Sequence, residues 1–278
     1  MGTDRETEMK NEKTVSALKV AVVAGTNIDT QMGIDYIENR VRQLREEIPC
    51  GSSGAAVTGT VMDMAAETAC CPIAETVPDM TIETAYCPVT ETCDDQVKFQ
   101  YYSDDEKRVR IDEIFGCETA LGTRDFFVYC NSLSGAFDFD SYAEEKGINI
   151  VTPLQVYRKL GRGHARIGVI AANNISAHGI EKALMAANPD IYMIGSGNMS
   201  IVHAIEEGRS PADIVKDCGI DHLIRYMEAC GSEAVVLGCT HFPYLKEEIE
   251  KLTSLPIIDP ADMMFDMLIS RMQEENAL

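Results

Sequence analysis

Short apolar runs alternate with segments of helical periodicity along most of this 278-residue chain. The runs Leu18–Ala24 and Arg166–Ala171 are nearly continuous in Val, Ile, Leu and Ala, which is typical of buried strands in a parallel sheet. Between such runs, apolar residues recur at helical spacing, for example at positions 34, 37, 41 and 44. Because a chain of this length can bury two linked cores, the alternation predicts an α/β fold with a mostly parallel sheet in each of two units.

Further strands are expected directly before Cys130 and Cys239. The remaining expected strands lie at 148–151, 191–194 and 257–258, and the expected helices at 109–115, 154–160, 176–187, 201–207, 211–230, 244–252 and 261–272.

Two stretches interrupt this order. Residues 1–14 are charged throughout and predict a flexible, solvated tail. From 49 to 97 the chain has no Lys, Arg or His, and the hexapeptide Glu67–Pro72 returns imperfectly as Glu83–Pro88. The change of composition predicts an insertion over 49–97, built either of β-hairpins or of a partly mobile segment.

The net charge and the cysteine content limit the classes of partner and the cellular compartment that are expected for this chain. The chain has 24 basic and 45 acidic residues, for a net charge of −21, which argues against nucleic acid and against an anionic membrane surface. No apolar run is long enough to span a bilayer, and residues 1–13 lack the apolar stretch of a secretory signal. A cytoplasmic protein with ten cysteines as thiols and a small-molecule partner is therefore expected.

The most informative chemistry is a pair of cysteines at equivalent places. Phe126–Tyr129 leads into Cys130, and Val235–Gly238 leads into Cys239. Each thiol would then lie at the carboxyl end of a strand, where open α/β sheets place their ligand chemistry. Two thiols supplied by two similar halves could face each other across a small substrate. That geometry suits removal of a proton from one face of a carbon and delivery of a proton to the other.

The residues around both cysteines resemble a known family. Val236–Pro243 resembles the second cysteine motif of the aspartate/glutamate racemase superfamily, and Cys130–Ser132 resembles the first cysteine motif of glutamate racemases. The resemblance extends loosely over 18–48 and 98–278.

What the resemblance implies for the architecture is a pair of pseudo-symmetric α/β domains with the active site in the cleft between them. The first domain would hold residues 15–150 and 243–278, the second 151–242, and a homodimer is a possible assembly. The implied activity is racemisation of glutamate or a related acidic amino acid without a cofactor.

Such a reaction needs these residue types for physical reasons. The α-hydrogen of an amino acid is a very weak acid, so a base must contact it while neighbouring groups stabilise the developing charge. A cysteine is a good base only as the thiolate, and its ordinary pKa of about 8.5 leaves little thiolate at neutral pH. Helix amino termini directly after Cys130 and Cys239 are expected to favour that form.

The resemblance also implies roles for individual residues. Cys130 would serve the D-enantiomer and Cys239 the L-enantiomer, with His241 as proton-relay partner of Cys239. Asp29 would assist Cys130, unless it only caps the next helix. Glu206 would be an auxiliary acid, or else an exposed helix glutamate. The expected substrate-binding residues are Thr30, Asn131, Ser132, Asn174 and Thr240.

Because two segments depart from the family pattern, the sequence does not identify the substrate. Val109–Asp112 stands where a Pro-Tyr-Gly substrate loop is expected, and Ala172–Ser176 replaces a Thr-bearing turn. The alternatives are an aspartate or hydantoin racemase, a related isomerase, or a non-catalytic binding or regulatory relative.

No metal is expected. The clustered cysteines lack the spacing of zinc or iron–sulfur sites and are interpreted as part of the repeat. These are Cys70, Cys71, Cys87 and Cys93.

Overall fold

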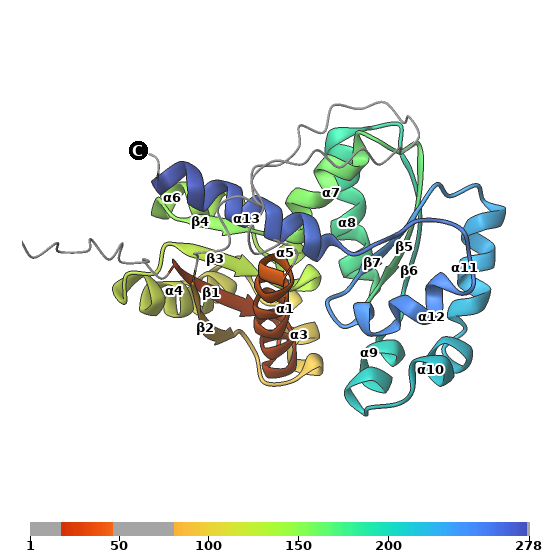
Figure 1. The fold of residues 1–278 in the computed structure, drawn as a ribbon, viewed down its shortest axis with the longest axis horizontal. Helices are drawn as coiled ribbons and strands as arrows, with labels where there is room; N and C mark the ends of the chain where they lie inside the picture. Colours follow the sequence, from red (N-terminus) through yellow and green to blue (C-terminus); the bar gives the residue numbers. More distant parts are fainter. Residues whose placement is uncertain (1–17, 47–80, 277–278) are drawn as a thin grey trace, which may run out of the picture.

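The computed structural model describes residues 18–46 and 81–276, and within them the strands form two parallel sheets of four strands each. The first sheet has the order β2-β1-β3-β4 and the second the order β6-β5-β7-β8. Figure 1 shows the sheets side by side, one in each half of the molecule. The predicted α/β class with two similar, mostly parallel halves is therefore confirmed. The strands are β1 (Leu18–Ala24), β2 (Ile82–Pro88), β3 (Asp125–Val128), β4 (Asn149–Val151), β5 (Arg166–Ala171), β6 (Tyr192–Gly197), β7 (Val235–Gly238) and β8 (Ile257–Ile258).

Helices pack around both sheets, and the central strands β1, β3, β5 and β7 are largely buried between them (Figure 1). They are α1 (Asn27–Glu46), α3 (Cys93–Gln100), α4 (Asp104–Ala120), α5 (Asn131–Ala136), α6 (Phe139–Lys146), α7 (Pro153–Gly161), α8 (Asn174–Ala187), α9 (Met199–Glu206), α10 (Pro211–Asp217), α11 (Ile220–Ala229), α12 (Lys246–Glu250) and α13 (Pro260–Asn276), with a 3-10 helix at Phe242–Leu245.

Part of the predicted insertion belongs to the first domain. β2 pairs with β1 in parallel along its full length, from Leu18 opposite Ile82 to Ala24 opposite Pro88, and Cys87 is buried in the core of that domain. The prediction of β-hairpins is therefore wrong for 82–88, because this segment completes a parallel edge that a hairpin cannot form. The rest of the predicted insertion, 49–80, and the predicted tail, 1–14, lie outside the described residues.

The chain returns to the first domain later than predicted. The expected return point was residue 243, but Phe242, Leu245 and Ile249 pack in the core of the second domain, and β8 pairs with β7. The return begins with α13, whose apolar face joins the core of the first domain. The reason is that β8 completes the second sheet before the chain can cross.

One predicted helix is two helices. The periodicity predicts a single helix over 211–230, but α10 ends at Asp217 and α11 begins at Ile220. Gly219 between them has φ of 70°. This left-handed conformation suits glycine and breaks the helical hydrogen-bond ladder.

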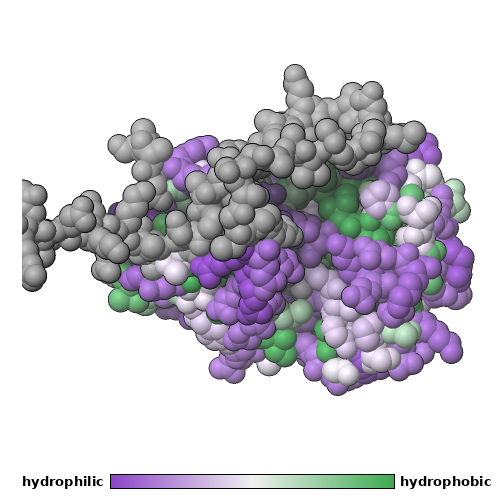
Figure 2. Space-filling model, viewed as in Figure 1, coloured by the Kyte–Doolittle hydropathy of each residue, from purple (hydrophilic) through white to green (hydrophobic). Residues whose placement is uncertain are grey.

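Among the coloured residues of Figure 2, hydrophilic ones predominate. None of the helices in the described part of the chain is long and apolar enough to cross a membrane.

The segment that leads from the second domain back to the first contains a half-buried carboxylate. Asp259 lies between β8 and α13, and its Oδ1 accepts a hydrogen bond from the backbone N–H of Ala261 at 2.9 Å. Burial raises the pKa of Asp259 to about 6, the nearby Asp262 adding to the effect. A raised carboxyl pKa in the folded state means that stability is lost as the pH rises from about 4 through about 6, because a charged group must then be buried.

The variant Asp259→Asn is therefore expected to be more stable than the parent at pH 8, with an unfolding free energy higher by about 1–2 kcal/mol, and so to unfold at a higher temperature. At pH 5 the gain should largely vanish, because Asp259 is then protonated. Thermal unfolding at both pH values measures this, with the exposed Asp190→Asn as matched control. An equal or lower unfolding temperature for Asp259→Asn at pH 8 would contradict the expectation.

Candidate active site

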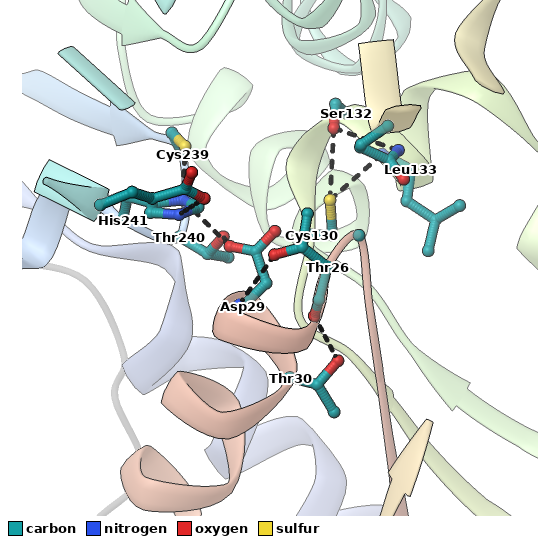
Figure 3. A network of polar contacts seen from close by, with 12 residues as sticks. Thr26, Asp29, Thr30, Cys130, Ser132, Leu133, Cys239, Thr240 and His241 are labelled. Carbon is teal, nitrogen blue, oxygen red and sulfur yellow. Dashed lines mark hydrogen bonds and ion pairs between the residues drawn. The ribbon is translucent and has the colours of Figure 1, made fainter. Parts of the chain in front are cut away.

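The two predicted cysteines lie in one cleft between the domains. Cys130 follows β3 of the first sheet and Cys239 follows β7 of the second, and both thiols line the cleft while being at least 93% buried. In Figure 3 they approach from opposite sides, with Asp29 and Thr240 between them. β3 and β7 hold the same position in sheets of the same order, so the fold itself makes the two thiols equivalent.

The cleft has about 380 Å³ of atom-free space, a volume that includes the part open to solvent. No Lys or Arg occurs among the described residues that line it. The lining consists of Thr26, Asp29, Cys93, Gln96, Val97, Gln100, Cys130, Asn131, Ser132, Ala172, Asn173, Met199, Val202, Gly238, Cys239, Thr240 and His241.

Cys130 begins α5 as its N-cap. Its Sγ lies 3.5 Å from the backbone N of Leu133 and 3.3 Å from Ser132 Oγ. Burial nevertheless raises the pKa of Cys130 to about 12, and the charge of Asp29 adds to this increase. The hydrogen bonds from Ser132 and Leu133 lower the pKa, but by less than burial raises it. The expectation that the helix terminus favours the thiolate here is wrong, because desolvation outweighs it. Cys130 is therefore a thiol at neutral pH in the free protein.

Cys239 lacks the helix terminus that the sequence predicts. Residues 239–241 form a turn, a 3-10 helix begins only at Phe242, and α12 begins at Lys246. The polar neighbour of the thiol is instead His241, whose Nδ1 lies 3.7 Å from Cys239 Sγ.

His241 is held between two carboxylates. Its Nδ1 lies 3.0 Å from Asp29 Oδ1, and its Nε2 lies 3.1 Å from Glu206 Oε1. Burial disfavours the charged ring, but the charge of Asp29 and the hydrogen bonds of Asp29, Cys239 and Glu206 outweigh it and raise the pKa of His241 far above its ordinary value. The hydrogen bond from His241 lowers the pKa of Glu206 against the effect of burial. His241 is thus an imidazolium beside Cys239.

Asp29 joins the two domains through polar contacts. It lies in the first turn of α1, and its Oδ1 accepts a 2.9 Å hydrogen bond from Thr240 Oγ1 as well as contacting His241. The sequence predicts Asp29 as an assistant of Cys130, or as a helix cap. The contacts of its carboxylate run to Thr240 and His241 of the second domain instead, and it acts on Cys130 through its charge, which raises the pKa of that thiol.

Two predicted substrate-binding residues lie outside the cleft lining. α1 begins at Asn27, earlier than predicted, so Thr30 is inside the helix and its hydroxyl donates to the backbone oxygen of Thr26 at 2.7 Å. Thr26 lines the cleft in its place. Asn174 is exposed at the start of α8, and Asn173, which caps that helix, lines the cleft. Each of these two residues lies one to four positions from the residue that lines the cleft, because the helix begins at a different place from the one predicted.

The remaining predicted residues lie where a ligand could meet them. Asn131, Ser132 and Thr240 all line the cleft. Asn131 Oδ1 accepts a hydrogen bond from the buried Tyr157 hydroxyl, whereas Asn131 Nδ2 is buried without a partner among the described residues. A buried, unpaired donor is costly, and a ligand carboxylate would satisfy it.

Sequence reasoning missed the cleft-facing side of α3. Cys93, Gln96, Val97 and Gln100 all line the cleft, and the side-chain oxygens of Gln96 and Gln100 are buried without partners among the described residues. Their spacing of i, i+3, i+4 and i+7 is the signature of one helix face. That signal was present but fell across the end of the segment interpreted as an insertion.

Comparison with known proteins supports the family resemblance. Residues 150–268 match the family model described as Asp/Glu/Hydantoin racemase. A glutamate racemase of Limosilactobacillus reuteri is 35% identical over 101 residues, which are 35% of this chain and 38% of that protein. A glutamate racemase of Carboxydothermus hydrogenoformans is 31% identical over 166 residues, which are 57% of this chain and 60% of that protein. The matches thus span between two fifths and three fifths of these relatives.

Solved structures share the fold across nearly the whole chain. A glutamate racemase isoform from Bacillus anthracis superimposes with a TM-score of 0.61 at 15% identity, covering 94% of this chain and 83% of that one. An aspartate racemase homologue from Pyrococcus horikoshii OT3 gives a TM-score of 0.58 at 16% identity, covering 92% and 99%. The resemblance to the aspartate/glutamate racemase superfamily is therefore confirmed, through a family model over residues 150–268 and a fold shared with a solved glutamate racemase and a solved aspartate racemase homologue.

Proposed function

We propose that this protein is an amino-acid racemase that works without a cofactor and uses Cys130 and Cys239 as an acid–base pair. The observation that carries the proposal is the placement of two buried thiols at equivalent strand ends of two like sheets, on opposite sides of one cleft. The racemase relatives and the shared fold support the same reaction class.

The two thiols divide the reaction between them. For the L-enantiomer, Cys239 as thiolate takes the α-proton, and the Cys130 thiol delivers its own proton to the opposite face of the α-carbon. One S–H bond forms and one breaks, so the pair ends with the roles exchanged. We assign the first base role to Cys239 because His241 holds a positive charge 3.7 Å from its sulfur, while the raised pKa of Cys130 keeps that thiol protonated.

Charge on the substrate carboxylate would be stabilised by neutral donors. Asn131, which lines the cleft, has a buried Nδ2 without a partner among the described residues, and Ser132 and Thr240 add hydroxyls to the lining. Gln96 and Gln100 offer unpaired carbonyl oxygens to an amino group. As preferred substrates we propose glutamate or a related acidic amino acid, in line with the curated relatives.

The experiment that tests the proposal is proton NMR of the purified, reduced protein in D₂O with single L-amino acids and no added cofactor. Glutamate and aspartate come first, followed by neutral amino acids and a hydantoin. Loss of the α-proton signal together with formation of the D-enantiomer would support racemisation and identify the preferred side chain. Folded protein that exchanges no α-proton from any of these compounds would exclude the proposed activity.

The variant Asn131→Ala is expected to raise KM by about 10- to 100-fold, because a hydrogen bond to a charged group contributes roughly 1.5–3 kcal/mol. The matched control is Asn174→Ala, which removes the exposed amide that the sequence alone favoured. A second control, Tyr157→Phe, breaks the contact to Asn131 Oδ1 but keeps the Nδ2 donor. Initial rates over a range of substrate concentrations measure the effect. A larger KM change in Asn174→Ala than in Asn131→Ala would overturn the assignment.

A further inference from the structure

A set of metal-binding side chains lies at the edge of the cleft, outside the acid–base pair. Cys93 and Asp94 are the first two residues of α3 in the first domain, and His203 lies on α9 of the second domain. Their potential ligand atoms all lie within 4.8 Å of one another, and His203 Nε2 is 3.4 Å from Asp94 Oδ1. Figure 1 shows α3 and α9 next to each other where the two halves of the molecule meet.

The donor set is one that zinc prefers. A thiolate, an imidazole and a carboxylate are the usual protein ligands of Zn²⁺, and three of them leave one of four positions open. Glu206 follows His203 on α9 by three residues and therefore lies on the same helix face. It already accepts a hydrogen bond from the Cys93 thiol and can supply a fourth ligand.

We propose that Cys93, Asp94 and His203 form a binding site for a divalent transition-metal ion, best suited to Zn²⁺, that joins the two domains at the edge of the cleft. Binding converts the Cys93 thiol to a metal thiolate and releases one proton to solvent. This site differs from the four-cysteine metal site that was considered from the sequence. Its other ligands are Asp94, the neighbour of Cys93 on α3, and His203 of the second domain.

The location gives the ion a regulatory effect. Cys93 lines the same cleft as Cys130 and Cys239, so an ion bound to it narrows the path of a substrate. Glu206 connects the site to His241 through the 3.1 Å contact at Nε2. When Glu206 turns toward the ion, His241 loses one of its two carboxylate partners. Zn²⁺ should therefore inhibit the proposed racemisation and at the same time hold the domains together.

The primary test uses Co²⁺ as a spectroscopic probe on the full, reduced and metal-free chain. One equivalent of Co²⁺ should produce thiolate-to-cobalt charge-transfer absorption, which Cys93→Ser should abolish. His203→Ala and Asp94→Asn should each weaken Co²⁺ binding by about 100-fold. The matched controls are Cys117→Ser and His178→Ala, both exposed and remote from these ligands, which should bind Co²⁺ like the parent.

Two further readouts separate this site from others in the chain. Zn²⁺ should raise the unfolding temperature of the parent but not of His203→Ala, because binding to the folded state alone stabilises it. Zn²⁺ should also inhibit racemisation by the parent at concentrations that leave His203→Ala active. This measurement depends on the proposed racemase function. The Co²⁺ absorption and the unfolding temperature do not depend on that function.

Three results would overturn the proposal. The first is the absence of charge-transfer absorption in the parent. The second is absorption that persists in Cys93→Ser, which would place the ion on other cysteines. The third is absorption that Cys239→Ser abolishes while Cys93→Ser retains it, which would place the ion on the proposed catalytic thiol.

Discussion

Replacing either Cys130 or Cys239 by serine is expected to lower kcat for racemisation by at least about 10³-fold in both directions, near the upper part of the range for a lost acid–base group. A serine hydroxyl is far less acidic than a thiol and cannot accept the α-proton at neutral pH. Since each enantiomer needs one residue as base and the other as acid, loss of either stops inversion. Optical rotation or chiral chromatography of the product measures the rate.

The two variants should differ in hydrogen exchange. In Cys130→Ser, Cys239 can still take the α-proton of an L-substrate and return a solvent deuteron to the same face. This variant should therefore exchange the α-proton of the L-enantiomer in D₂O without inversion. Cys239→Ser should exchange that of the D-enantiomer far more slowly, because the raised pKa of Cys130 keeps its thiol protonated at neutral pH. The matched control is Cys117→Ser, at an exposed position on α4. Racemisation at the parent rate in either single variant would exclude the two-thiol mechanism.

The variants Asp29→Asn and His241→Asn are expected to lower kcat by about 10²- to 10³-fold, the second largest effect. Asp29 is the main group that raises the pKa of His241, and His241 is the charged neighbour of Cys239. Removing the aspartate charge should let the pKa of His241 fall back toward its ordinary 6.5. The imidazolium would then be lost within the neutral range as the pH rises.

The consequence is a change in pH dependence. In the parent, the pKa of His241 is raised far above neutral, so kcat should show no loss from this group between pH 6 and pH 9. In Asp29→Asn, kcat should fall as the pH rises through that interval. The charged His241 ring also contributes to the stability of the fold. Because its pKa is raised in the folded state, this contribution is complete below pH 6.5 and is lost only as the pH rises through the raised pKa.

Rates measured from pH 6 to 9, with NMR titration of the His241 ring, test this expectation. The control is Glu38→Gln, which removes an exposed acid from the same helix. An unchanged pH profile in Asp29→Asn would show that the carboxylate does not hold the charge on His241. A folded His241→Asn with full kcat would remove that residue from the mechanism.

Local patterns predicted the strands well. β1, β5 and β8 begin and end where the apolar runs do. In β1 and β5 the run is rich in Val, Ile and Ala and largely buried, as is typical of a strand in a parallel sheet. The helix starts were predicted less well, and Thr30 and Asn174 were misplaced for that reason. A helix start depends on which side chain caps it, and that choice is settled by contacts the sequence pattern does not contain.

The segment around β2 and α3 shows a different limit. Its composition suggested an insertion, yet β2 completes the first sheet and α3 supplies one wall of the cleft. An edge strand needs less apolar surface than a central one, so Ile82–Pro88 has no run that stands out from its neighbours. Only the pairing of β2 with β1 reveals its place.

What the sequence by itself determined is the presence of two like halves and of one thiol at the end of an equivalent strand in each. This information is local, because the strand and the residue after it are adjacent in the chain. The surroundings of the thiols were decided by the tertiary structure alone. Thr240 contacts Asp29 across 211 positions, and His241 receives its charge from a carboxylate of the other domain. The protonation of a buried group depends on which distant charges the fold brings against it, and no local pattern encodes that.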